Sequence, residues 1–189
     1  MRKGLIAAAL AATMAAPFTA SAADYVIDTQ GAHASVNFKV SHLGYSYIQG
    51  RFNTFSGEFS YDPSNVAAAK VNVTIDTTSL DSNHAERDKH LRSGDFIDAG
   101  KFSNATFVST KVEPLDGKKL AITGDLTLHG KTAPITIDAT FIGAGADPWG
   151  GERAGFEGTT TLQLADFGIE AMGMVDKVEM QLIVEGVKK

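Results

Sequence analysis

Apolar and polar residues alternate with a period of two along most of this chain. The clearest runs lie at residues 34–40, 55–61, 71–75, 120–128, 135–141 and 178–184, and weaker ones at 105–112 and 156–164. Such alternation is typical of β-strands that bury one face. With residues 24–40 counted as a single strand, the pattern predicts eight strands.

Turn-forming residues separate these runs. Compact turns are predicted at residues 62–65, 116–117 and 129–131, with hairpin tips at Asp116-Gly117 and Gly130-Lys131, and a longer glycine-rich loop at 143–151. Residues 82–92 alone break the alternation. They predict a short helix with Asp81 or Ser82 as its N-cap.

These elements predict an all-β fold, namely an eight-stranded antiparallel β-barrel with a short helix near its mouth. A closed barrel leaves no sheet edge unpaired, and one of eight strands has room for packed side chains or one small ligand. A β-sandwich is the structural alternative. The small residues on the inward rows fit either a hollow interior or tight bends: Gly57, Gly124, Ala139 and Gly158.

The first 22 residues have the features of a secretory signal peptide. A basic start at residues 1–3 is followed by an apolar stretch at 4–14, then Pro17 and the small residues Ala20-Ser21-Ala22. The stretch is too short for a membrane span. We therefore expect one domain at residues 23–189, in a protein that is exported.

The charge balance bears on the kind of partner. Without its first 22 residues the chain carries 15 Lys and Arg against 22 Asp and Glu. This acidic balance argues against a nucleic-acid partner, because phosphate binding requires a basic face.

The largest apolar side chains fall on the rows that alternation assigns to the barrel interior. They form either an ordinary core or the lining of a dry tunnel. In a tunnel, each buried methylene of a lipid would contribute about 0.8 kcal/mol, so the tail would supply most of the binding free energy. The predicted lining residues are Phe38, Phe55, Phe59, Phe107, Ile137, Phe141, Phe156 and Leu162.

A polar cluster occupies the helical segment from His84 to Asp95. Its two histidines, His84 and His90, are six residues apart, which is a poor spacing for a metal site on a helix, so no metal is predicted. The cluster has no clear nucleophile, and no catalytic residue is predicted. It is either a salt-bridged cap or a polar mouth that holds a lipid head group. The predicted mouth residues are His84, Arg87, Asp88, His90 and Arg92.

Six sequence motifs stand in a definite order along the chain: residues 42–44 with 50–52 and 55–57, 83–93 with 95–96, 122–130, 132 with 134, 153–156, and 166–168. In these motifs and their order, the sequence resembles the YceI family of periplasmic, lipocalin-like, polyisoprenoid-binding proteins. The resemblance implies an elongated barrel of the Gram-negative periplasm that receives an isoprenoid chain, with the head group near the helical segment. It is also compatible with a homodimer.

The function predicted from these observations is a soluble periplasmic carrier for a long isoprenoid lipid, such as a quinone or a prenyl phosphate, with no other cofactor. An enzyme that acts on a lipid head group through the His84–Asp95 cluster is the alternative. An outer-membrane barrel is a third reading. Four Tyr and one Trp are too few for two aromatic girdles, which argues against stable membrane insertion.

Overall fold

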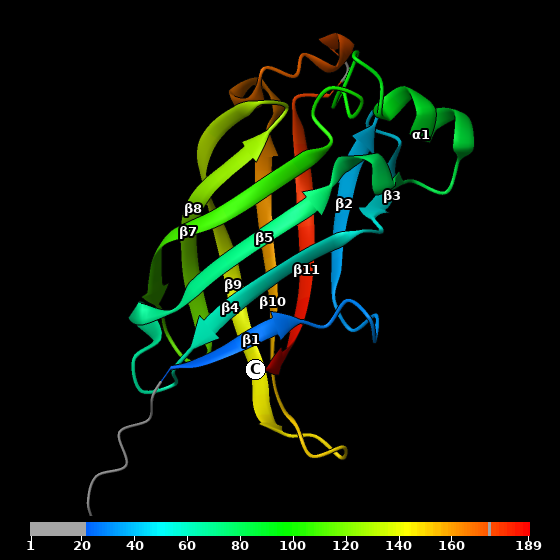
Figure 1. The fold of residues 1–189 in the computed structure, drawn as a ribbon. Coiled ribbons are helices and arrows are strands. Elements are labelled where there is room, and N and C mark those ends of the chain that lie inside the picture. The colour runs from blue at the N-terminus through cyan, green and yellow to red at the C-terminus, as the bar shows by residue number, and fades with distance from the viewer. Residues whose placement is uncertain (1–21, 174) are drawn as a thin grey trace, which may run out of the picture.

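The computed structural model describes residues 22–173 and 175–189, so the predicted signal peptide lies outside the described residues except for Ala22 (Figure 1). The strands are β1 (Ala23–Ile27), β2 (Ser35–His42), β3 (Ser46–Phe52), β4 (Phe55–Tyr61), β5 (Lys70–Asp76), β6 (Leu80–Asp81), β7 (Asn104–Pro114), β8 (Lys119–Leu128), β9 (Lys131–Ala146), β10 (Glu152–Gln163) and β11 (Lys177–Lys188). The helix α1 spans Ala85–Leu91, and four short 3₁₀ turns are η1 (Val66–Ala68), η2 (Thr77–Ser79), η3 (Leu164–Phe167) and η4 (Ala171–Gly173). No helix in this described part of the chain is long and apolar enough to cross a membrane.

The strands form a closed antiparallel β-barrel. Going round the barrel, the order is β1-β4-β5-β7-β8-β9-β10-β11, and the pairing of β11 with β1 closes the ring. Strand β2 pairs with β11 on one side and with β3 on the other, and β3 pairs in turn with β6. The predicted barrel of eight antiparallel strands with one short helix is confirmed.

The segment predicted as one strand at residues 24–40 is two strands that share one neighbour. β1 pairs with the last residues of β11, whereas β2 pairs with β11 between Glu179 and Ile183. Residues 28–34 separate the two strands, and β2 then runs along β11 in the same direction as β1. The single-strand prediction was wrong in this detail, but the place of the segment in the barrel is the same.

Strand β3 is a further element that alternation did not predict. Its inward positions are Ile48, Gly50 and Phe52, and the glycine interrupts the apolar row. A Cβ at Gly50 would overlap the ring of Phe38 on β2, so packing requires glycine there. Because the ring requires glycine at an inward position, β3 lacks the regular apolar alternation by which strands are predicted.

The helix is shorter than predicted, and its N-cap differs. α1 begins at Ala85, and its cap is His84, whose ring nitrogen accepts the Arg87 N–H at 3.2 Å. Ser82 does not cap the helix because its backbone N–H and hydroxyl both donate to Asp88.

Two turns also differ from their predictions. The β8–β9 tip lies at His129-Gly130, both at positive φ, rather than at Gly130-Lys131. The predicted loop at 143–151 is shorter, because β9 continues to Ala146 and pairs there with Glu152. The remaining turn folds around Asp147, whose carboxylate accepts backbone N–H groups two and four residues further on.

Glycine on the inward rows permits close packing rather than creating empty space. At Gly124, a Cβ would lie 2.5 Å from the Phe107 ring and 2.5 Å from the Val108 carbonyl oxygen. At Gly57, a Cβ would lie 2.6 Å from the Asn72 carbonyl oxygen. These contacts show a third role that neither sequence reading included, because each glycine makes room for a neighbouring ring or backbone group in the barrel wall.

Replacing Gly124 with alanine is expected to lower the free energy of unfolding by about 1–3 kcal/mol, because ring and backbone must both move. Urea unfolding followed by circular dichroism measures this change. Gly143→Ala is the matched control, since a Cβ on that β9 glycine meets nothing within 4 Å. An equal loss in both variants would show that the Phe107 contact is not the cause.

Candidate ligand-binding cavity

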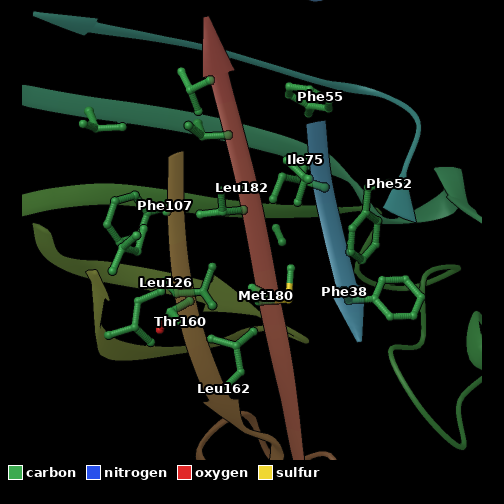
Figure 2. Close-up of a pocket in the computed structure, with 18 of the residues that line it drawn as sticks. Phe38, Phe52, Phe55, Ile75, Phe107, Leu126, Thr160, Leu162, Met180 and Leu182 are labelled. Carbon is green, nitrogen blue, oxygen red and sulfur yellow. The ribbon is translucent and has the colours of Figure 1, made fainter. Parts of the chain in front are cut away.

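The barrel encloses a cavity of about 260 Å³ lined almost entirely by apolar side chains (Figure 2). Closely packed protein interiors hold few voids larger than a water molecule. A hollow of this size is therefore a feature of the fold and not ordinary core packing. Because its walls offer almost no hydrogen-bond partners, such a cavity stays dry and suits an apolar ligand.

Seven of the eight predicted lining residues border the cavity. They are Phe38, Phe55, Phe59, Phe107, Ile137, Phe156 and Leu162. Leu126, Met180 and Leu182 also line it, from runs that the alternation had identified (Figure 2). The predicted lining was drawn mainly from the largest apolar side chains, so it included most of the phenylalanines and omitted these aliphatic residues.

The eighth, Phe141, belongs to an aromatic cluster at the end of the barrel away from α1. Its ring stacks on Tyr61 at 5.1 Å between centroids and lies 5.3 Å from Phe156. Phe156 also meets Phe59 edge-on at 5.5 Å, and Phe59 stacks on Tyr25 at 4.9 Å. Burial raises the pKa of Tyr61. These five rings fill this end of the barrel.

Two connecting segments cross the other end of the cavity. Leu91 at the end of α1 and the following Phe96 and Ile97 contribute lining from one connection, and Ile169 and Val175 from the β10–β11 connection. These residues lie outside any period-two run, so alternation could not identify them. Fully buried Phe167 anchors the second connection, where its carbonyl oxygen lies 3.2 Å from His129 Nδ1.

The predicted polar mouth forms an internal hydrogen-bond network. Asp88 Oδ1 accepts the Ser82 N–H at 2.7 Å and the Ser82 hydroxyl at 2.5 Å. Arg87 donates to the hydroxyl and carbonyl oxygens of the same serine. Arg92 donates to the carbonyl oxygens of Thr78 and Leu80 at 3.1 Å each. These bonds tie α1 to the strand that precedes it.

In the described part of the chain, the side chains of the cluster's two histidines make no hydrogen bond to Ser82 or Asp88. His90 Nε2 lies 3.3 Å from Asp95, and its ring contacts Phe96, which lines the cavity. His84, Asp88 and Arg92 border a separate, open polar depression beside β6. None of the five predicted mouth residues is among those that line the apolar cavity, so their contact with a head group stays a prediction.

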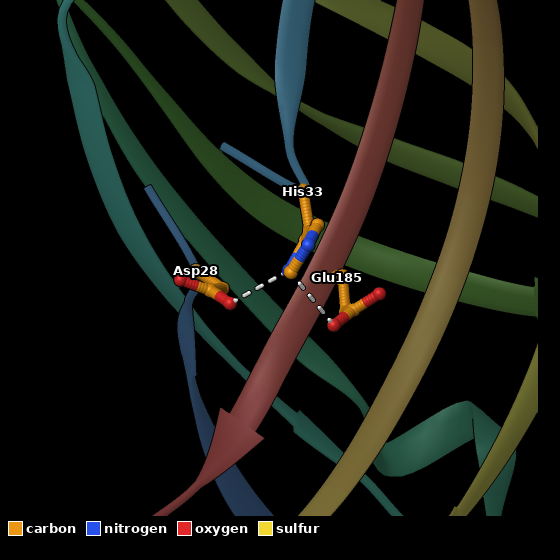
Figure 3. Close-up of side chains that lie close together, drawn as sticks. All are labelled: Asp28, His33 and Glu185. Atoms are coloured by element: carbon orange, nitrogen blue, oxygen red, sulfur yellow. Dashed lines mark hydrogen bonds and ion pairs between the residues drawn. The ribbon is translucent and has the colours of Figure 1, made fainter. Parts of the chain in front are cut away.

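A second polar cluster joins β1, β11 and the loop between β1 and β2. Asp28, His33 and Glu185 bring their ligand atoms within 4.8 Å of one another, which is a spacing compatible with a metal ion (Figure 3). Arg153 occupies the same space: Nη1 donates to Asp28 at 2.7 Å and to Glu185 at 2.6 Å. A cation would have to displace this guanidinium, so the cluster is an ion-pair network.

Comparison with known proteins places the chain in a family. The model of the YceI-like domain matches residues 25–186. The chain belongs to the YceI family. Its relatives include UPF0312 proteins of Vibrio vulnificus, 71% identical, and of Vibrio cholerae, 67% identical, in each case over 100% of both chains. The resemblance noted in the sequence is thereby confirmed.

Solved YceI-type structures share the barrel. BcnA of Burkholderia cenocepacia aligns with a TM-score of 0.74 at 26% identity, over 84% of this chain and 98% of that one. The YceI protein of Campylobacter jejuni aligns with a TM-score of 0.71 at 30% identity, over 80% and 91% of the two chains. A polyisoprenoid-binding domain from Saccharophagus degradans has the same fold, with a TM-score of 0.63 at 16% identity, over 89% and 100%.

Replacing Asp88 with alanine is expected to destabilise this YceI-family protein by about 2–3 kcal/mol, because the buried Ser82 donors lose their acceptor. Urea unfolding measures the loss. Glu86→Ala is the control, since Glu86 is an exposed neighbour on the same helix. A stability of Asp88→Ala equal to that of the control would contradict a structural role for the Ser82–Asp88 bonds.

The ion-pair network predicts a pH-dependent contribution to stability. Hydrogen bonding to Arg153, aided by the Gly31 N–H, lowers the pKa of Asp28 from 3.8 to about 2. A lowered folded-state pKa means that the stabilisation is present above about pH 4 and is lost as the pH falls toward 2. Asp28→Asn is expected to cost about 1–2 kcal/mol at pH 7, and the difference from the unsubstituted protein should shrink toward zero near pH 2.

Urea unfolding of both proteins across this pH range makes the comparison. Asp138→Asn, at an exposed position of β9, serves as the control and is expected to leave stability unchanged. A difference for Asp28→Asn that stayed constant down to pH 2 would rule out the charge on Asp28 as its source.

Proposed function

We propose that this protein binds a long isoprenoid lipid in the barrel cavity and carries or sequesters it in the periplasm. The observation that carries the proposal is the apolar cavity of about 260 Å³ in a barrel whose end away from α1 is filled by aromatic rings. The lining is apolar apart from Ser35, Ser60, Thr160 and the exposed Glu157. An uncharged chain is the ligand that such a wall accepts without leaving polar groups unpaired.

Binding in this cavity is dominated by the tail. Each methylene moved from water into the apolar interior contributes about 0.8 kcal/mol before the costs of association. A charged head group gains nothing from these walls, so it lies beyond the lining at the α1 end. Quinones and prenyl phosphates both fit this division between a long apolar chain and a compact polar head.

Membership of the YceI family supports the same ligand class. The domain from Saccharophagus degradans that shares the fold is described as polyisoprenoid-binding. Export to the periplasm is supported by the signal-like residues 1–22. A carrier there would give an isoprenoid lipid an aqueous route between membranes.

The proposal assigns binding rather than catalysis. Three polar side chains of the cluster are engaged in its own hydrogen bonds. Arg87 and Arg92 donate to Ser82 and to backbone carbonyl oxygens, and Asp88 accepts from Ser82. Side chains whose hydrogen bonds hold α1 in place are poorly placed to transfer protons to a substrate. The alternative of a head-group enzyme would rest on the His90–Asp95 pair, at 3.3 Å, which lies outside this hydrogen-bond network.

Replacing Leu182 with tryptophan is expected to reduce the bound lipid about tenfold, because the larger ring takes up cavity volume near its centre. Native mass spectrometry of the exported protein, followed by organic extraction, measures lipid per chain. The same measurement on the unsubstituted protein is expected to show an isoprenoid in stoichiometric amount.

Gln181→Trp is the matched control, because Gln181 is the preceding residue of β11 and is exposed on the outer face. It should keep its lipid. Thermal unfolding of both variants checks that the barrel has formed. An unsubstituted protein that is empty, and stays empty when offered quinones and prenyl phosphates, would overturn the proposed function.

A further inference from the structure

The β2–β3 hairpin carries an unusual set of exposed apolar side chains at its tip. Leu43 is 67% exposed, Tyr45 88% and Tyr47 63%. These three residues are called the apolar tip below. Three large side chains within five positions form a local patch, whereas exposed apolar residues on soluble proteins are normally scattered singly.

The turn itself disfavours the leucine that it holds. Leu43 and Gly44 both lie at positive φ, +53° and +76°, and the Tyr45 N–H donates to the His42 carbonyl oxygen at 3.0 Å. Hairpin turns of this kind usually hold Asn, Asp or Gly at such positions, because a left-handed backbone strains other side chains. Leu43 is thus both at a strained backbone position and largely exposed to water.

The apolar tip lies on the same hairpin as part of the cavity wall. Phe38, Val40 and Phe52, at the base of the same hairpin, line the cavity. Leu43 lies three residues beyond Val40, or about 10 Å along the strand. The arrow of β2 points to the end of the barrel that carries α1 and the β10–β11 connection (Figure 1). The tip therefore projects from the end where the proposal above puts the lipid head group.

Charge also distinguishes this segment. The whole chain has a net charge of −5, yet residues 29–57 contain no Asp or Glu, while Lys39 and Arg51 are both present. Lys39 is paired with Glu179 at 2.6 Å and lies over the Tyr47 ring at 4.6 Å. The hairpin thus brings no acidic side chain of its own to a surface that it approaches.

We propose that the apolar tip docks this protein reversibly on a phospholipid bilayer. The inference rests on the proposed function, because a carrier of isoprenoid lipid must take up its cargo from a membrane. Leu43 inserts below the head groups, and Tyr45 and Tyr47 lie at the interface, where tyrosine is favoured. The absence of acidic side chains avoids repulsion from anionic lipids. So small an apolar element gives weak attachment, which a shuttling carrier requires.

The test is flotation of the exported protein with vesicles of phosphatidylethanolamine and phosphatidylglycerol. Leu43→Asn removes the apolar side chain and places a favoured residue at positive φ, so this variant is expected to fold at least as stably as the unsubstituted protein. It should float about fivefold less, and Leu43→Asn with Tyr45→Ser about tenfold less. Leu115→Ser is the matched control, since Leu115 is an apolar residue of the β7–β8 turn that is 52% exposed. This variant should leave flotation unchanged.

Isoprenoid content measured by native mass spectrometry on the same samples separates the two proposals. Reduced flotation with lipid content retained supports docking by the tip. Unchanged flotation of the double variant, or equal loss in Leu115→Ser, overturns it. An empty barrel that still floats through Leu43 would contradict the carrier function and not the docking. If the unsubstituted protein does not float but forms a dimer that Leu43→Asn dissociates, the tip is a contact between copies and the docking proposal is wrong.

Discussion

The structure depends on the pairing of β1 with β11. Three residue pairs close the ring, among them Tyr25 with Lys188 and Ile27 with Gly186. A Cβ at Gly186 would lie 2.5 Å from the Phe59 ring and 2.8 Å from Tyr25 Cβ, so the closure requires glycine where these residues meet. Without this pairing, two strand edges would be free and the apolar interior would open to water.

The hollow interior follows from the way in which aromatic rings meet the barrel wall. Phe107 lies against Gly124, Phe38 against Gly50, and Phe59 against Gly186, each in space that a Cβ would occupy. A ring that settles against the wall over a glycine occupies less of the centre than one that projects straight inward. Glycine and phenylalanine together thus give a barrel whose wall is well packed and whose axis is open.

Period-two alternation was sufficient to predict the eight positions round the barrel and most of the inward rows, because burial of one face imposes that period on each strand. It did not predict β3, where Gly50 accommodates Phe38. Nor did it identify Phe96 and Ile169, which line the cavity from connecting segments that have no period-two pattern. It also could not tell that Phe141 stacks on Tyr61 at one end, because depth along the barrel axis leaves no mark on alternation.

The two ends of the barrel differ in the kind of interaction that holds them. Five stacked and edge-on rings fill one end, and such a cluster would have to come apart as a unit to admit a chain. At the other end two connections cross the cavity. The first is fastened mainly by the hydrogen bonds that Ser82, Asp88, Arg87 and Arg92 make, and the second by buried Phe167, whose carbonyl oxygen lies near His129. Segments held by a few hydrogen bonds open at lower free energy than packed strands. Passage of a ligand is therefore easier at the α1 end, and the β2–β3 hairpin projects from that end.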